Sequence, residues 1–206
     1  MKIINSSYEI LTDISPNALE ELRQIEKVAR TCYKSEDAID EDGRSAQRLV
    51  SHLVENKHEA MLEHSYLSVK FICDRGVSHE IVRHRLFSFA QESTRYCNYS
   101  KDKFNGEITV IKPSLFSEDS FDYDIWKESC KVAESAYFKL IRIGCTPEMA
   151  RDVLPMSVKT EIVVSGNYRE WRHFFELRDN PKAHPQMVEL AKPLHKELHE
   201  KIPFVF

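Results

Sequence analysis

The chain has 206 residues, 42% of them hydrophobic, and a formal net charge of −4, which is typical of a globular protein with one domain over residues 1–206. No apolar run is long enough to span a membrane, and the acidic balance argues against a general nucleic-acid-binding protein. The N-terminal segment carries acids where a secretory signal needs apolar residues, so we expect a cytoplasmic protein.

The cysteines are odd in number and widely spaced, and no CxxC pair occurs. Such spacing favours neither a disulfide framework nor a zinc knuckle. We therefore expect reduced thiols, mostly buried, at Cys32, Cys73, Cys97, Cys130 and Cys145.

Two helices and a strand are predicted in the first third of the chain. Ser15-Pro16 is typical of a helix start, and apolar residues follow at helical spacing: Leu19, Leu22, Ile25, Ala29 and Cys32. A second amphipathic helix over residues 44–56 places on one side Ala46, Leu49, Val50, Leu53 and Val54. Residues 66–73 alternate, which predicts a strand with one face made of Leu67, Val69, Phe71 and Cys73.

The remaining elements alternate between helix and strand without a βαβ rhythm. A long helix is predicted over residues 120–143, with a buried stripe of Trp126, Cys130, Ala133, Tyr137 and Leu140. A short helix opens at Thr146-Pro147 and ends before Pro155, and residues 157–165 alternate as a strand. Helices over 168–177 and 184–199 follow, the last with a kink at Pro193. The predicted class is α+β, with an antiparallel β-sheet packed with helices.

The densest chemical segment covers residues 83–96. Three arginines (Arg83, Arg85 and Arg95) are interleaved with hydroxyl and amide side chains, and the wider segment 75–103 has six Lys or Arg against three acids. Arginine binds phosphate in a bidentate way, while Ser, Thr and Gln suit a ribose or a base edge. The alternative is a solvated basic loop, but apolar residues around the arginines favour a partly buried surface that a bound anion would neutralise.

A second cluster lies near the C-terminus and contains Asn167, Arg169, His173 and Arg178. In a helix over residues 168–177, Arg169 and His173 share a face because they are four residues apart. Spacing alone favours a simpler alternative, in which exposed basic residues pair with nearby acids.

Taken together, these segments resemble the flavin-dependent thymidylate synthase family, whose signature is R-H-R-x-x-S-x-N-E-x-S-x-R-Y. The matching residues here are Arg83-His84-Arg85, Ser88, Ser93 and Arg95-Tyr96. Family-like segments also occur at 31–35, 58–64, 150–155, 167–169 and 174–178. Ala90 and Gln91 replace the Asn and Glu of the signature. Glutamine keeps a hydrogen-bonding carbonyl at position 91 but supplies no carboxylate, for which the adjacent Glu92 is the alternative source.

The resemblance implies a flavin enzyme without a Rossmann fold. FAD would be bound by Ser35, His58, Arg83, His84, Arg85, Gln91, Asn167, Arg169 and His173. The nucleotide dUMP would be bound by Glu80, Arg83, Gln91, Glu92, Ser93, Thr94, Arg95, Arg151 and Arg178. Arg178 would be catalytic, since a permanent positive charge stabilises the anion formed as uracil N3 ionises.

The implied reaction converts dUMP, methylenetetrahydrofolate and NADPH into dTMP and tetrahydrofolate. The resemblance also implies a homotetramer with active sites shared between subunits, and no cysteine nucleophile. We therefore interpret Cys97 as a bystander thiol and assign Ser93 to substrate binding.

Two other functions are weaker alternatives. A metal-dependent hydrolase would draw ligands from His58, His64, His79 and His84 with Glu63, but the adjacent arginines would repel a cation. A nucleic-acid-binding protein would combine Arg83, Arg85 and Arg95 with the aromatic residues Phe87, Phe89 and Tyr96, against an acidic overall charge.

Overall fold

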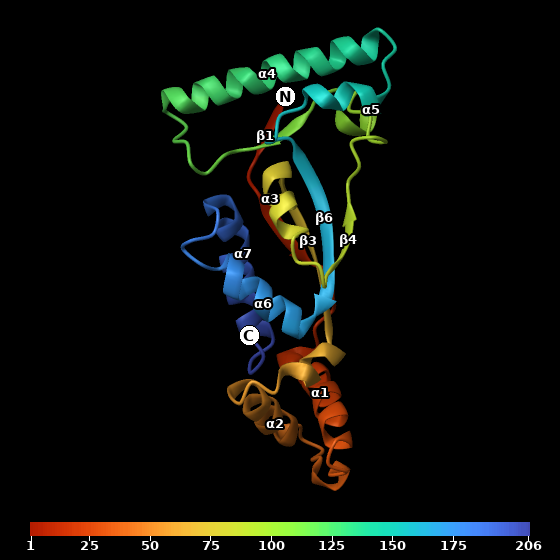
Figure 1. Cartoon of the computed structure of the whole chain (residues 1–206), viewed down its shortest axis with the longest axis vertical. Helices are drawn as coiled ribbons and strands as arrows, with labels where there is room; N and C mark the ends of the chain where they lie inside the picture. Colours follow the sequence, from red (N-terminus) through yellow and green to blue (C-terminus); the bar gives the residue numbers. More distant parts are fainter. The chain divides into compact units, whose positions relative to one another are not determined.

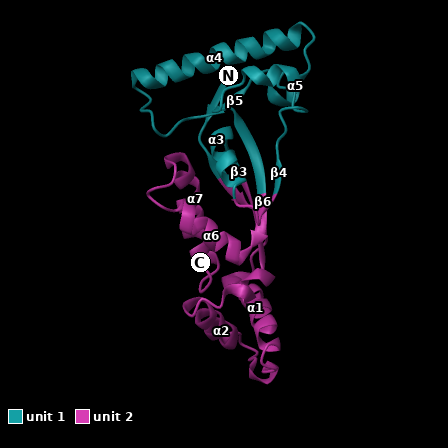
Figure 2. Ribbon diagram, in the orientation of Figure 1, with its two compact units in different colours: residues 1–7, 71–83, 89–163 teal, residues 8–70, 84–88, 164–206 magenta.

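The computed structural model describes all 206 residues. The chain divides into two compact units, coloured separately in Figure 2. Unit 1 comprises residues 1–7, 71–83 and 89–163, and unit 2 comprises residues 8–70, 84–88 and 164–206. The strands of the larger sheet contribute residues to both units. That residues 1–206 form a single domain stays a prediction.

The larger sheet has four strands in the order β2-β3-β6-β4. Figure 1 labels β3, β6 and β4 of this sheet. Their bounds are Ser7–Ile10 for β2, Tyr66–Asp74 for β3, Lys159–Asn167 for β6 and Ser88–Gln91 for β4. Neighbouring strands run antiparallel, as predicted. Along β2 and β3, the Leu11 N–H donates to the Ser68 carbonyl, and the Lys70 ammonium pairs with Glu9. Along β3 and β6, the hydroxyls of Ser68 and Ser165 form a hydrogen bond, and the Tyr168 N–H donates to the Ser65 carbonyl.

The alternation seen in the sequence is confirmed in both long strands. In β3, Leu67, Val69, Phe71 and Cys73 are all buried. In β6, the buried face comprises Thr160, Ile162, Val164 and Gly166, and the intervening residues are partly exposed. One buried face per strand produces the period of two from which these strands were predicted.

A second, two-stranded sheet joins β1 (Lys2–Ile4) to β5 (Thr109–Ile111) in parallel, with Lys2 opposite Thr109. The antiparallel prediction therefore holds for the larger sheet only. Strands of three residues are too short to show a period, which is why the sequence did not predict them.

In unit 1, polar side chains cap the helices. Asp74 accepts a hydrogen bond from the Val77 backbone at 2.7 Å and so begins α3 (Arg75–Ile81). Ser120 caps α4 (Phe121–Arg142), and Thr146 caps α5 (Pro147–Ala150), after which a 3-10 turn, η5, covers Arg151–Val153. A further 3-10 turn, η4, covers Asp102–Phe104. Of the stripe predicted on α4, Cys130 and Tyr137 are fully buried and join a core with Tyr99, Ile108, Val110 and Ala150.

In unit 2, the predicted N-terminal helix is divided. A 3-10 turn, η1 (Pro16–Ala18), precedes α1 (Leu19–Thr31), because Asn17 and Ala18 both adopt positive φ. Leu22, Ile25 and Ala29 are buried, but Cys32 lies past the end of the helix and is exposed, contrary to the prediction. Helix α1 packs against α2 (Arg44–Glu55), and two 3-10 helices complete this region: η2 (Glu36–Ala38) and η3 (Glu59–His64).

The C-terminal helices of unit 2 are α6 (Tyr168–Arg178) and α7 (Pro185–Lys201), which pack against each other. Helix α7 includes Pro193 in its interior. Trp171 of α6 is buried and donates its indole N–H to the Leu67 carbonyl of β3 at 3.0 Å, which fixes the helix to the strand. No helix of the chain combines the length and apolar character that a membrane span requires.

Candidate active site

The signature segment of unit 1 leaves strand β4 through Gln91, whose side chain is held by two hydroxyls. The Gln91 amide donates to Ser78 Oγ at 3.0 Å and to Thr160 Oγ1 at 3.2 Å. Ser78 Oγ in turn donates to the Arg75 carbonyl at 2.9 Å, so its single proton is already used. Position 91 therefore favours a hydrogen-bond donor facing Ser78, which an amide supplies and a carboxylate does not.

Glu92 is enclosed by partners within the same unit. Its carboxylate pairs with Lys159 Nζ at 2.9 Å and accepts from the Tyr99 hydroxyl at 3.3 Å. Its backbone is held as well, since the N–H donates to the Glu161 carbonyl at 2.8 Å and the carbonyl accepts from Arg75 at 3.2 Å. Burial and the Glu92 carboxylate together raise the pKa of Tyr99, so its hydroxyl keeps its proton and donates it.

The next residues form a turn whose polar side chains are partly or fully exposed. The Ser93 carbonyl accepts from the backbones of Tyr96 and Cys97, while Ser93 and Thr94 stay half-buried. Arg95 is exposed and pairs with Glu148 of α5 at 2.6 Å, three residues before Arg151. Arg151 itself is partly exposed, with Asp152 at 4.0 Å.

Helix α3 and the residues directly after it carry the remaining candidates of unit 1. Glu80 lies in its last turn, and the backbone N–H of Arg83 donates to the Glu80 carbonyl at 3.3 Å. The Arg83 side chain is exposed and forms no ion pair. The contacts of Gln91 with Ser78 and of Glu92 with Arg75 join this helix to the signature segment, so unit 1 brings together most of the predicted dUMP set: Glu80, Arg83, Gln91, Glu92, Ser93, Thr94, Arg95 and Arg151.

In unit 2, the histidine of the signature contacts the predicted catalytic arginine. Arg178 Nε donates to His84 Nε2 at 3.0 Å, which requires an unprotonated nitrogen there. Burial, reinforced by the charges of Arg178 and His173, lowers the pKa of His84 to about 4. The remaining proton of the neutral ring lies on Nδ1, which faces the buried carboxylate of Glu170 at 3.6 Å.

His84 is therefore oriented toward Arg178 and surrounded by aromatic rings. Its ring lies 5.1 Å from that of Phe174 and 5.9 Å from that of Phe87. Phe87 packs on Trp171 at 4.7 Å and lies directly over Gly166 of β6, where an added Cβ would meet its Cδ1 at 2.1 Å. Gly166 thus leaves the space in which the ring of Phe87, three residues after His84, is buried.

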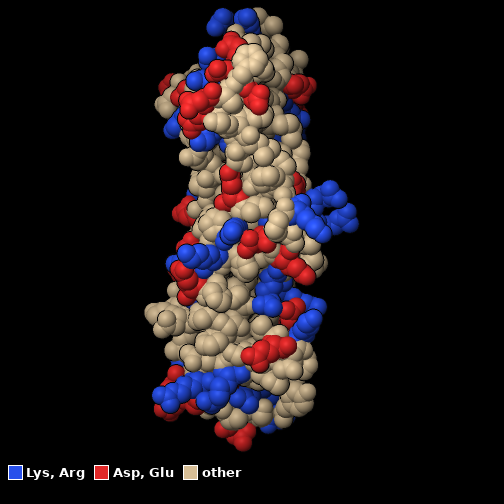
Figure 3. Space-filling view, turned by 90° about the vertical axis from the view of Figure 1, so that its left-hand side faces the viewer, with Lys and Arg blue, Asp and Glu red and all other residues tan.

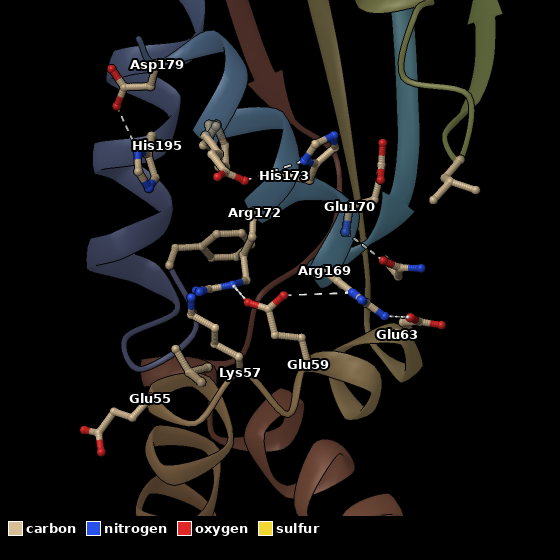
Figure 4. Close-up of a pocket in the computed structure, with 16 residues that line it drawn as sticks. Glu55, Lys57, Glu59, Glu63, Arg169, Glu170, Arg172, His173, Asp179 and His195 are labelled. Carbon is tan, nitrogen blue, oxygen red and sulfur yellow. Dashed lines mark hydrogen bonds and ion pairs between the residues drawn. The ribbon is translucent and has the colours of Figure 1, made fainter.

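Unit 2 also contains a pocket of about 1020 Å³, shown in Figure 4. Two arginines of α6 extend into it and pair with carboxylates of η3: Arg169 with Glu63 at 2.6 Å and Arg172 with Glu59 at 3.0 Å. On another side, His195 of α7 pairs with Asp179 at 2.8 Å and stacks flat on Phe175.

The pocket includes only part of the predicted FAD set. Asn167, Arg169 and His173 line it, and Asn167 also caps α6 by accepting from the Glu170 backbone at 2.9 Å. His58 does not line it, although its neighbours Lys57 and Glu59 do, and Ser35 lies half-buried at the start of η2. Arg85 is exposed and has no ion pair, while the adjacent Leu86 lines the pocket.

Six residues that were not predicted from the sequence contact the candidate residues or line the same pocket. They are Ser78, Thr160 and Lys159 in unit 1, and Glu59, Arg172 and Glu170 in unit 2. Glu59 lies within the family-like segment 58–64, which was the only signal in the sequence for any of them.

The charges elsewhere are mixed. On the face shown in Figure 3, Lys and Arg side chains are interspersed with Asp and Glu and form no continuous positive surface. We find no group of three or more His, Cys, Asp or Glu side chains that could hold a metal ion.

Comparison with known proteins places these segments in one family. The family model described as "Thymidylate synthase complementing protein" matches residues 16–204. A flavin-dependent thymidylate synthase of Corynebacterium aurimucosum is 32% identical over 213 residues, covering 94% of this chain and 82% of that protein. One from Pyrococcus furiosus is 36% identical over 145 residues, covering 70% of this chain and 59% of that protein.

Solved structures include one with the same fold. The crystal structure of the UMP/dUMP methylase PolB from Streptomyces cacaoi, bound with 5-Br dUMP, matches with a TM-score of 0.77 and 22% identity, covering 100% of this chain and 95% of that one. At this identity the similarity concerns the fold. Together with the sequence relatives, the findings show that the chain belongs to the flavin-dependent thymidylate synthase family.

Proposed function

We propose that this protein reductively methylates dUMP to dTMP, with methylenetetrahydrofolate as the carbon donor and NADPH as the reductant. The observation that carries the proposal is the contact between Arg178 and His84, which joins two family segments 94 residues apart in the sequence. A guanidinium held on its Nε by a neutral, buried histidine has a fixed orientation and keeps its charge. A cation fixed in this way is suited to stabilise a negative charge that develops on a uracil ring.

Residues of unit 1 would bind the nucleotide. Arg83, Arg95 and Arg151 are exposed or partly exposed, and guanidinium groups suit a phosphate monoester. Gln91 has its amide nitrogen engaged by Ser78 and Thr160, so it would offer its carbonyl oxygen as an acceptor. Ser93 and Thr94 would add hydroxyl groups for the phosphate or the ribose.

Family membership implies a flavin cofactor, and we propose that it is FAD. Donors in unit 2 would hold its phosphates: Arg169, His173 and Asn167 line one pocket, and the exposed Arg85 lies beside Leu86, which also lines it. Carboxylates line the pocket as well, and Arg169 would have to exchange its pairing with Glu63 for a phosphate. Ser35 and His58 complete the proposed set. When bound, the flavin supplies hydride, so the folate product is tetrahydrofolate.

We also propose that the active enzyme is a homotetramer with shared sites. Support comes from large apolar side chains that this chain leaves exposed, among them Tyr33, Tyr66 and Leu86, which are 87%, 65% and 78% exposed. Leu86 follows the Arg-His-Arg signature directly, so a second subunit that covered it would reach residues of the proposed cofactor site.

The test is spectroscopic. The purified protein should show flavin absorption, and anaerobic NADPH should bleach it faster when dUMP is present. Product analysis after addition of methylenetetrahydrofolate should then show dTMP and tetrahydrofolate. A protein that takes up no FAD on reconstitution, or whose bleaching is indifferent to dUMP, would contradict the proposal.

A further inference from the structure

The loop that contains Ser93, Thr94 and Arg95 is closed at its base. Glu92 at the start of the loop accepts a hydrogen bond from the hydroxyl of Tyr99 at its end, at 3.3 Å. Tyr99 is buried, and its own backbone N–H donates to the Tyr137 hydroxyl in the core of unit 1 at 3.3 Å. Both ends of the loop therefore meet at one carboxylate.

Lys159, the first residue of β6, holds this carboxylate in place. Its ammonium lies 2.9 Å from Glu92 Oε2, and the exposed fractions of the two side chains are only 16% and 11%. Lys159 also pairs with Glu161 at 2.8 Å, but that partner is 45% exposed. Burial opposes the charge of Lys159, yet its contacts with the carboxylates of Glu161 and Glu92 raise its pKa, so the lysine stays protonated.

These contacts separate Glu92 from its neighbours in the signature. Glu92 Oε1 accepts from Tyr99, and the buried Oε2 lies 2.9 Å from the Lys159 ammonium as an ion pair without a hydrogen bond, whereas the side chains of Ser93 and Thr94 are partly exposed and that of Arg95 is exposed. A nucleotide phosphate would be repelled by a carboxylate and attracted by Arg95. Glu92 is thus suited to hold the loop and not to contact the substrate.

We propose that Lys159 and Glu92 form a positioning pair that holds the 93–95 loop in the conformation that binds the dUMP phosphate and ribose. This inference rests on the proposed function and revises the predicted role of Glu92 from a substrate contact to a support. The pair acts through Ser93, Thr94 and Arg95 and touches no reacting atom. A positioning role of this kind changes substrate affinity more than the rate of the chemical step.

The experiment compares four variants by steady-state kinetics and by dUMP titration calorimetry. Lys159→Met should raise the KM and Kd for dUMP at least about tenfold and change kcat by less than about threefold, with an unchanged flavin spectrum. Lys159→Arg should recover most of the affinity, because it restores the charge. Glu161→Gln is the matched control, since it removes the exposed partner of Lys159 and should leave KM within about twofold of wild type.

The fourth variant distinguishes positioning from simple destabilisation. Lys159→Met leaves Glu92 as an unpaired buried charge, whereas Lys159→Met with Glu92→Gln removes both charges and should recover thermal stability. If the pair positions the loop, this double variant still has a raised KM. Recovery of a normal KM in the double variant, or a normal KM in Lys159→Met, would overturn the inference. Failure of the wild-type enzyme to form dTMP would instead count against the proposed function.

Discussion

Replacement of Gly166 by alanine tests how the signature segment is seated in unit 2. The added Cβ would lie 2.1 Å from Cδ1 and 2.5 Å from Cε1 of Phe87. Because carbon atoms pack at about 3.5–4.0 Å, the ring would have to move by more than about 1 Å. It has no free space to enter, since it is buried against Trp171 at 4.7 Å and Phe174 at 6.1 Å between ring centroids.

Overpacking of this kind costs about 1–3 kcal/mol, and the short distances favour the upper end of that range. We therefore expect Gly166→Ala to lower the free energy of unfolding by about 3 kcal/mol, which corresponds to a fall in Tm of about 6–12 °C for a chain of this size. Urea and thermal unfolding followed by circular dichroism would measure the loss. Since Phe87 follows His84 by three residues, flavin content should fall as well.

A second substitution identifies the cause. Phe87→Leu in the Gly166→Ala background should restore at least about 1 kcal/mol, because it removes the clashing ring edge. Gly106→Ala is a control, since nothing lies within 4 Å of its Cβ position and only the cost of its positive φ, about 1 kcal/mol, remains. The reasoning would be refuted if Gly166→Ala unfolded like the wild type, or if its loss persisted after Phe87→Leu.

Three further predictions concern the proposed chemistry. Arg178→Ala should retain the fold and most flavin absorption but lower dTMP formation about 10²–10³-fold; near-normal turnover would exclude Arg178 from catalysis. Cys97→Ala should keep its activity, because no covalent role is assigned to that thiol, and an inactive, folded, flavin-loaded variant would contradict this. The pKa of His84 is lowered to about 4, so as the pH falls the unfolded chain binds a proton near pH 6.5, whereas the folded chain binds it only near pH 4. Stability from this group is therefore complete above pH 6.5 and declines toward pH 4, by about 3 kcal/mol at most. Burial raises the pKa of Glu170, which acts in the opposite direction, so the measurement is the difference in urea stability between wild type and His84→Gln across this range; parallel curves would refute the assignment.

The elements that were predicted correctly share one property: each is long and buries one face. Strands β3 and β6 and helix α4 were found within one or two residues of their observed bounds. Helix α3 was missed because it has only seven residues, includes Gly76 and begins at the Asp74 cap without a clear apolar period. Strand β4 was missed for a similar reason, since it has four residues and lies within the polar signature.

The family signature led to the candidate site, yet it did not reveal how its residues are supported. His84 and Arg178 were assigned to different roles, one to the cofactor and one to the substrate, and the structure joins them by a hydrogen bond. Glu92 was assigned to the substrate from its position alone, and the structure encloses it with Lys159 and Tyr99. The partners in these pairs are between 7 and 94 residues apart in the chain, so the spacing of residues within one helix or strand does not predict the contacts.

By itself, the sequence determined the family, the α+β class and the polar residues from which a site is built. The family follows from the resemblance of residues 83–96 and the other matching segments, while the α+β class follows from local period, which depends on the burial of one face of each element. Only the tertiary structure decided which of those polar groups face a ligand and which face one another. That choice depends on contacts between distant elements: the partly buried Lys159 of β6 pairs with Glu92, and the hydroxyl of Thr160 accepts from Gln91 of β4.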